Sequence, residues 1–409
     1  MNFMRCRPAI RLLSGFAACL QIFQSAYAAV PVANNQSAQQ NVTSVFMTNH
    51  IARALRYTPI GTDFVITNGL EFFNRPLYGG NTAFRVDAGD KPEFSLYLPG
   101  RGGNLRLGIK TRAGVKWLND AQKIIARYQP GAMTYEIQDA LLMSHVELRL
   151  TALPLSGTKG FIIRAELDSA RLPVELVWAF GGANGMKGQR GGDIGCEREP
   201  VSQFFQLRPE QCRGNEFSIA TNAFVLRSKT ATIAGVASAG AIHSIADAKQ
   251  WENLSRLLVS ARTTNVLPVV AGEIELPPAQ PVFLALLPVE SGGKFFSAEE
   301  LPELFLKAEE HRRAVAERVV VETPDAFINA AAAALNVAAD AIWDDQQQSF
   351  MHGAVAWRQR LLGWRGPYAG RTGLARPHGE TFRGICQTAE CKSGSGNNSL
   401  RRRERQSRA

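Results

Sequence analysis

The chain has 409 residues, of which 45% are hydrophobic and 20% charged, a composition that fits a folded globular protein and argues against extensive disorder. Its formal net charge is +10, but three of these positive charges lie in residues 1–28 and a net six lie in residues 371–409. The body between these two ends is therefore nearly neutral. It lacks the net positive charge with which nucleic-acid-binding proteins attract phosphates, so we exclude this class of function. No apolar run reaches the ~20 residues of a transmembrane helix, so we expect no membrane span in the mature protein.

Residues 1–28 have the layout of a secretory signal peptide. Three arginines and no acid precede an apolar run at residues 12–23, and Ala26-Tyr27-Ala28 supplies a small-x-small cleavage site. We expect export to the periplasm or the extracellular space, with residues 29–49 as a flexible N-terminal segment. A buried N-terminal helix and a lipid anchor on Cys19 are the less favoured alternatives, the latter because the lipoprotein box before Cys19 is only partial.

The cysteines, histidines and glycines limit the sites that the chain can form. Export implies an oxidising compartment, in which Cys196 and Cys212 are the natural disulfide pair, with two free thiols as the alternative. The six histidines are scattered and no two sit at zinc-binding spacing, so we expect no metal site. The Gly-rich stretch 181–195 lacks both a Gly-Lys-Ser/Thr motif and a following amphipathic helix, so we expect a loop and no nucleotide cofactor.

From about residue 50 to residue 292 the sequence predicts a large antiparallel β-sandwich. Short runs of alternating apolar and polar residues, such as Leu105 to Ile109, are separated by Gly, Pro and Asn turns. The strand-helix alternation of a parallel sheet is missing. The run 64–67 ends at Asn68-Gly69, a dipeptide typical of a β-hairpin.

The predicted secondary structure changes from β-strands to α-helices near residue 297. Ser297-Ala298-Glu299-Glu300 has the spacing of a capping box, and apolar residues after it recur at helical spacing, which predicts a linker helix within residues 297–322. The β-branched run 319–321 ends this helix. A second helix is predicted to start with Thr323 as its N-cap and Pro324 at its first position. Its apolar stripe consists of Phe327, Ala331, Ala334, Leu335, Ala338 and Ile342.

Side chains suited to ligand binding or catalysis are most concentrated between residues 343 and 368, which include three of the six tryptophans. Trp rings stack on the C–H faces of sugars, and Asp, His and Arg side chains hydrogen-bond hydroxyls, so this mixture favours a carbohydrate cleft. Asp344, Asp345 and His352 are candidates for acid–base catalysis, each with a structural role as the alternative. The candidate substrate-binding residues here are Trp357, Arg358, Trp364, Arg365 and Tyr368.

Several motifs together resemble a secreted bacterial family of largely unknown function. They are Asn68-Gly69, the runs 73–79, 84–86 and 89–94, and residues 352–368. That family is similar in layout to the six-hairpin glycosidases, which combine a β super-sandwich, a linker helix and an (α/α)6 barrel. The resemblance covers about residues 50–370 and implies that a sugar binds between sandwich and barrel.

The resemblance implies both site residues and a function. Asn74, Arg75, Tyr78 and Glu93 would line the sandwich side of the cleft, with turn and core scaffolding as the alternative. The implied fold is mainly β with C-terminal helices: a β super-sandwich, a linker helix, and the first helix of an incomplete (α/α)6 barrel over residues 323–370. The implied activity is glycosidic bond cleavage in an oligosaccharide or polysaccharide, and the alternative is a non-catalytic carbohydrate-binding or cell-surface sandwich protein.

The pattern of that family stops near Gly370. Arg, Gly, Ser and Asn dominate residues 371–409, which we expect to be a disordered basic tail. A frameshift near Gly370 is the favoured explanation, because codon degeneracy permits a polar-aromatic, helix-compatible peptide in the shifted frame; a natural linker or tail is the alternative. We therefore expect this chain to lack the complete active site and the activity of its full-length relatives.

Overall fold

A computed structural model of the chain describes residues 55–79, 84–98, 100–143, 145–169, 173–187, 201–261, 266–289, 296–341, 343–344 and 349–350. The chain divides into two compact units after Arg56, and the elements described below all belong to the unit that begins at Tyr57. The predicted signal peptide, Cys19 and the basic tail 371–409 lie outside the described residues.

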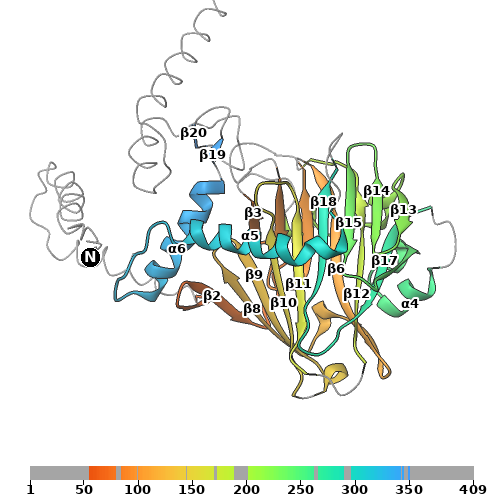
Figure 1. Cartoon of the computed structure of the whole chain (residues 1–409), viewed down its shortest axis with the longest axis horizontal. Helices are drawn as coiled ribbons and strands as arrows, with labels where there is room; N and C mark the ends of the chain where they lie inside the picture. The colour runs from red at the N-terminus through yellow and green to blue at the C-terminus, as the bar shows by residue number, and fades with distance from the viewer. Residues whose placement is uncertain are drawn as a thin grey trace, which may run out of the picture. The chain divides into compact units, whose positions relative to one another are not determined.

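Two large antiparallel sheets dominate this unit (Figure 1). The ten-stranded sheet has the order β1 (Thr58–Ile60), β2 (Asp63–Thr67), β8 (Lys123–Gln129), β9 (Ala132–Gln138), β10 (Leu148–Pro154), β11 (Phe161–Leu167), β18 (Val282–Pro288), β15 (Thr232–Ala237), β14 (Ala223–Arg227) and β13 (Glu216–Ala220). The eight-stranded sheet has the order β16 (Ile242–Asp247), β17 (Pro268–Glu275), β12 (Glu175–Ala183), β6 (Arg101–Thr111), β5 (Glu93–Tyr97), β4 (Arg85–Ala88) and β3 (Arg75–Tyr78), with β7 (Gly114–Trp117) also paired to β6.

Helices occur mainly at the C-terminal end of the described chain. They are α3 (Val201–Phe204), α4 (Leu254–Val259), α5 (Leu301–Ala316) and α6 (Ala326–Ala341), with short 3-10 turns at Leu118–Asp120, Ala140–Leu142, Pro209–Cys212, Ala248–Gln250 and Ala298–Glu300. After α6 a two-stranded hairpin pairs β19 (Trp343–Asp344) with β20 (Ser349–Phe350). The predicted fold class, mainly β with C-terminal helices, is confirmed.

The core lies between the two sheets and follows the period-two pattern of the sequence. Leu105, Leu107 and Ile109 of β6 are fully buried in one cluster with residues of both sheets, because alternate side chains of a strand point to the same face. Trp178 of β12 packs into this core beside Gly272 of β17, where an added Cβ would lie 2.2 Å from the Trp178 ring. Glycine at position 272 is therefore required by the close approach of the indole.

Asn68-Gly69 does not form the predicted hairpin. The chain leaves β2 in the ten-stranded sheet and enters β3 in the eight-stranded sheet. Asn68 adopts a left-handed conformation with φ 51°, and its side-chain oxygen accepts a hydrogen bond of 2.9 Å from the Ile124 amide. Asn68 and Gly69 favour a turn, but the hydrogen bond from Ile124 of β8 fixes a crossover between the two sheets instead of a two-strand hairpin.

The predicted capping box forms at the 3-10 turn Ala298–Glu300, which leads directly into the linker helix α5. The Ser297 amide donates a 2.8 Å hydrogen bond to the Glu300 carboxylate, and the helix ends at Ala316, before the β-branched run. Its apolar face packs on the outer side of the ten-stranded sheet, with the Phe305 and Phe283 rings 5.7 Å apart. Figure 1 shows α5 crossing these strands.

The start and the buried face of α6 differ from the prediction. The N-cap is Asp325 and not Thr323, because the Asp325 carboxylate accepts the Phe327 amide at 2.8 Å, while the Thr323 hydroxyl pairs with the Asn329 side chain. The buried face carries Ala330, Ala333 and Val337, whereas Leu335 of the predicted stripe is 57% exposed. The helix is rich in alanine on every side, so its sequence period cannot distinguish the two faces.

Candidate functional site

Helix α5 has a hollow on each side where it crosses the ten-stranded sheet. The first, named here the junction hollow, is lined by Tyr78, Gly79, Gly131, Pro154, Leu155, Ala308, His311, Arg312, Val315, Val337 and Asp340. It lies where the sandwich, α5 and α6 meet, and its volume of about 20 Å³ fits one water-sized group. The second, named the polar groove, has a volume of about 490 Å³ and lies along the opposite side of α5.

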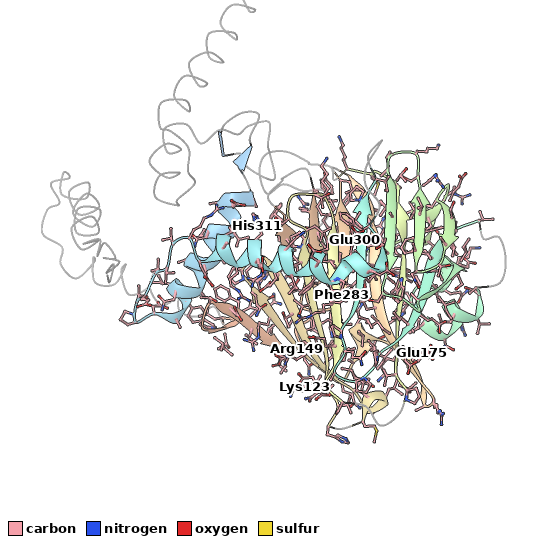
Figure 2. All side chains as sticks on the ribbon, viewed as in Figure 1. Lys123, Arg149, Glu175, Phe283, Glu300 and His311 are labelled. Atoms are coloured by element: carbon pink, nitrogen blue, oxygen red, sulfur yellow. The ribbon has the colours of Figure 1, made fainter. Side chains whose placement is uncertain are left out.

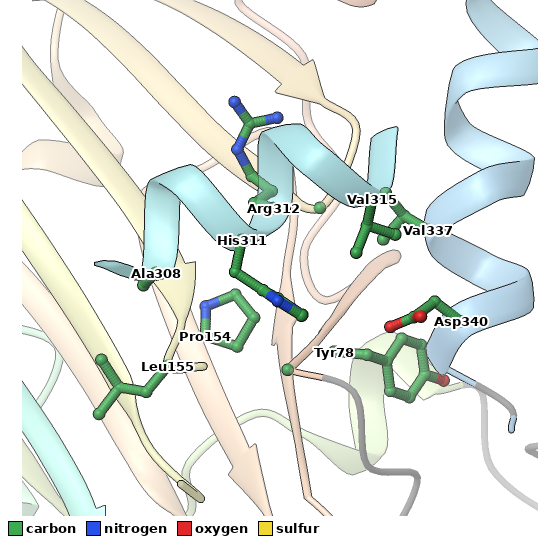
Figure 3. Close-up of a pocket in the computed structure, with 11 residues that line it drawn as sticks. Tyr78, Pro154, Leu155, Ala308, His311, Arg312, Val315, Val337 and Asp340 are labelled. Atoms are coloured by element: carbon green, nitrogen blue, oxygen red, sulfur yellow. The ribbon is translucent and has the colours of Figure 1, made fainter. Parts of the chain in front are cut away.

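Polar side chains from three elements converge on the junction hollow. Tyr78 comes from the end of β3, His311 from α5, and Asp340 from the last turn of α6. Figure 3 shows the His311 ring pointing from α5 toward the Tyr78 ring, with the Asp340 carboxylate beside it. The Asp340 carboxylate also accepts a 2.6 Å hydrogen bond from Arg318, which fixes its position at the rim.

Tyr78 of β3 lies opposite Arg85 of the neighbouring strand β4. The positive charge of Arg85 opposes the rise in the Tyr78 pKa that burial causes. The Nε of Arg85 donates to both oxygens of the buried Asp87, at 3.2 and 3.0 Å, and its guanidinium lies 4.5 Å from the centroid of the Tyr97 ring. Burial raises the pKa of Tyr78, so its phenol remains protonated near neutral pH.

Asp87 is a buried carboxyl that pairs with Arg85. Its burial raises its pKa to about 6, although the charge of Arg85 opposes the shift. The carboxyl group is almost inaccessible, with 3% of its side chain exposed, so it is not positioned to contact a ligand directly. Perturbed groups of this kind are common at functional sites, and in structural ion pairs as well.

Asn74 and Arg75 make contacts inside the protein, next to the start of the described chain. The Asn74 amide donates to the Tyr57 hydroxyl at 3.2 Å, and that hydroxyl donates to Asp90 at 2.7 Å. The Arg75 guanidinium lies 4.3 Å from the centroid of the Tyr57 ring. These contacts order the turn before β3, and contact of Asn74 or Arg75 with a sugar stays a prediction.

Glu93 of β5 is buried beside Arg106 of the neighbouring strand β6. Its carboxylate accepts hydrogen bonds from Arg106 at 2.7 Å and Asn119 at 2.8 Å, and 2% of the residue is exposed. Burial raises its pKa despite the opposing charge of Arg106. Of the four residues predicted on the sandwich side, Tyr78 alone is among those that line the junction hollow.

Most of the other predicted site residues fall outside the described part of the chain. They are Asp345, His352, Trp357, Arg358, Trp364, Arg365, Tyr368 and Cys196. Asp344 lies in β19, where its backbone pairs with Ser349. Cys212 is buried, and burial raises the pKa of its thiol to about 12; its pairing with Cys196, which lies outside the described residues, stays a prediction.

Sequence reasoning missed His311, Arg312 and Asp340. All three lie on helix faces that also carry solvated polar residues, and nothing in a single sequence separates a polar residue beside a hollow from one in water. Within the described ranges, no cluster of three or more His, Cys, Asp or Glu side chains could hold a metal, and no helix is long and apolar enough to cross a membrane.

The chain matches one protein family over more than half of its length. Residues 98–309, just over half of the chain, match the family described as a domain of unknown function, DUF4450. No curated protein matches the chain.

Two solved structures with sugar-related names are similar to this chain. One is a bacterial glucoamylase complexed with acarbose, with a TM-score of 0.43 and 10% identity over 68% of this chain and 43% of that one. The other is a human-microbiome protein assigned as a kojibiose phosphorylase, with a TM-score of 0.41 and 9% identity over 72% of this chain and 43% of that one. The chain thus spans less than half the length of either structure.

Proposed function

The chain belongs to the DUF4450 family, and we propose that it is an exported, glycoside hydrolase-like protein that binds an oligosaccharide or polysaccharide where the sandwich meets its C-terminal helices. The observation that carries this proposal is the convergence of Tyr78, His311 and Asp340 on the junction hollow. An aromatic ring offers a face for sugar C–H groups, while imidazole and carboxylate groups hydrogen-bond hydroxyls.

The junction hollow is large enough for one substituent of a sugar ring, but not for the whole ring. A space of about 20 Å³ accepts one hydroxyl or hydroxymethyl group but not a sugar ring, so the ring itself would lie above the hollow. The aromatic and polar segment 343–368 follows α6 directly in the sequence. We propose that this segment supplies the remaining contacts, with Trp357, Trp364 and Tyr368 against the sugar faces.

Cleavage of a glycosidic bond would require two carboxyl groups, one as acid and one as base or nucleophile. Asp344 and Asp345 remain the proposed candidates in this chain, with His352 beside them. We further propose that the chain is inactive because its pattern departs from its relatives near Gly370. The second candidate function is non-catalytic glycan binding, which is favoured by the single carboxylate among the residues that line the hollow, that of Asp340.

A binding and hydrolysis assay tests this proposal. The purified full chain is screened by affinity electrophoresis against plant and host polysaccharides, and in parallel for release of reducing sugar. We expect binding to at least one glycan without release of sugar, and at least tenfold weaker binding by His311→Ala. His145→Ala is the matched control, because His145 is an exposed histidine on a loop. The proposal fails if no glycan binds, or if both variants bind like the parent chain.

A further inference from the structure

The polar groove lies on the outer face of the ten-stranded sheet, across α5 from the junction hollow. It is lined by Asp63, Arg127, Gln129, Thr134, Glu136, Arg149, Thr151, Arg164, Phe305, Leu306, Glu309 and Arg313. Its volume of about 490 Å³ falls within the ~300–1,000 Å³ typical of ligand sites. Figure 2 shows Arg149 on the sheet and His311 on α5, on opposite sides of the helix.

The floor of the groove contains a row of side chains that crosses four neighbouring strands. Arg127 of β8 is paired with Thr134 of β9, Thr134 with Thr151 of β10, and Thr151 with Arg164 of β11. Directly paired residues of an antiparallel sheet point to the same face, so two arginines flank two threonine hydroxyls. At a strand spacing of about 4.8 Å, the backbones of the two arginines lie roughly 14 Å apart.

The arginines at both ends of this row are fixed by contacts within the protein. Arg127 pairs with Asp63 at 3.4 Å, and Arg164 pairs with Glu166 at 3.1 Å. The Arg164 guanidinium also lies 4.7 Å from the centroid of the Phe305 ring of α5. Their side chains are 23% and 30% exposed, so part of each guanidinium is accessible from the groove. Because the ion pairs already order these side chains, they lose little conformational entropy when a ligand binds.

The balance of charge in the groove selects the class of ligand. Four arginines and three carboxylates line it, and they are interspersed. Arg149, for example, lies directly opposite Glu136 and is 4.0 Å from its carboxylate. A polyanion would be attracted by the arginines but repelled by the carboxylates. A sugar hydroxyl both donates and accepts hydrogen bonds, so it can bind to both kinds of group.

We propose that the polar groove is a second carbohydrate site, separate from the junction hollow, that holds a neutral linear glycan lying across strands β8 to β11. The spacing between strands is close to the length of one pyranose unit in an extended glycan, so successive sugars would meet successive members of the row. In this arrangement Thr134 and Thr151 hydrogen-bond the central sugars, and Arg127 and Arg164 bind the hydroxyls of the outer ones.

Calorimetric titration of the full chain tests the groove. The probes are cellohexaose, mannohexaose and xylohexaose, with heparin and polygalacturonate as polyanions. We expect one of the neutral hexaoses to bind equally well in low and high salt. The double variant Thr134→Val/Thr151→Val removes both hydroxyls and keeps the β-branched shape, and we expect it to weaken binding at least tenfold.

The controls separate this site from the fold and from the junction hollow. Thr67→Val makes the same exchange at an exposed position of β2 outside the groove, and should bind like the parent chain. A glycan whose binding His311→Ala weakens is assigned to the junction hollow, and a hexaose whose binding the double threonine variant weakens is assigned to the polar groove. The proposal is overturned if no neutral hexaose binds, if the double variant binds normally with an unchanged melting temperature, or if only the polyanions bind and salt abolishes that binding.

Discussion

His243 makes the stability of the sandwich depend on pH. Its ring centroid lies 5.5 Å from that of Trp178 and 5.4 Å from that of Phe224. Both ring nitrogens are buried without a hydrogen-bond partner among the described residues. Burial lowers the pKa of His243 from an ordinary value of 6.5 to about 4, because a charged imidazolium has no solvent or partner there.

The direction and size of the effect follow from this lowered pKa. Above pH 6.5 the imidazole is neutral in both the folded and the unfolded chain, and it adds no dependence on pH. As the pH falls toward 4 the unfolded chain binds the proton first, so the free energy of unfolding decreases. The full shift corresponds to at most about 3.4 kcal/mol, and solvent screening of the half-buried ring reduces the loss at pH 5 to about 1–2 kcal/mol.

Urea unfolding of the parent chain and of His243→Phe at pH 7 and pH 5 measures this effect. Phenylalanine keeps an aromatic ring between Trp178 and Phe224 but cannot titrate. We expect the loss of stability from pH 7 to pH 5 to be smaller in the variant by about 1–2 kcal/mol. His145→Gln, at an exposed loop position, should lose as much as the parent. An identical pH dependence in His243→Phe and the parent would refute the reasoning.

Two further predictions concern buried groups of the eight-stranded sheet. Arg106→Leu leaves the Glu93 carboxylate buried without its 2.7 Å partner, so we expect urea unfolding to show a loss of about 3–5 kcal/mol; a loss below about 1 kcal/mol would contradict the buried pair. Gly272→Ala places a methyl group 2.2 Å from the Trp178 ring, so we expect a lower melting temperature by calorimetry; an unchanged one would show that the indole can move aside.

The strands could be predicted because the alternation of apolar and polar residues is a local pattern. The pairing of the strands could not be predicted, because it joins distant parts of the chain. The alternation at Leu105, Leu107 and Ile109 identifies both a strand and its buried face. The pairing of Leu107 with Trp178 joins residues far apart in the chain, and nothing in either run specifies it. The Asn68-Gly69 turn shows the same limit, because its crossover depends on a bond to Ile124.

The candidate site could be predicted only in part, for a related reason. The family motif points to Tyr78, which lines the junction hollow, while its contact with a sugar stays a prediction. His311 and Asp340 reach the same hollow from two helices whose packing on the sheet is a tertiary property. The sequence does not indicate the polar groove, because its row of four residues forms only when four separate strands pair in this register.

A glycan is proposed to bind where the sandwich meets its C-terminal helices. Hydrogen–deuterium exchange of the full chain, with and without the glycan that binds best in the screen, tests this claim most directly. We predict slower exchange at the end of β3, around Tyr78, and in the second half of α5, around His311. Unchanged exchange in both segments at saturating glycan would contradict the claim.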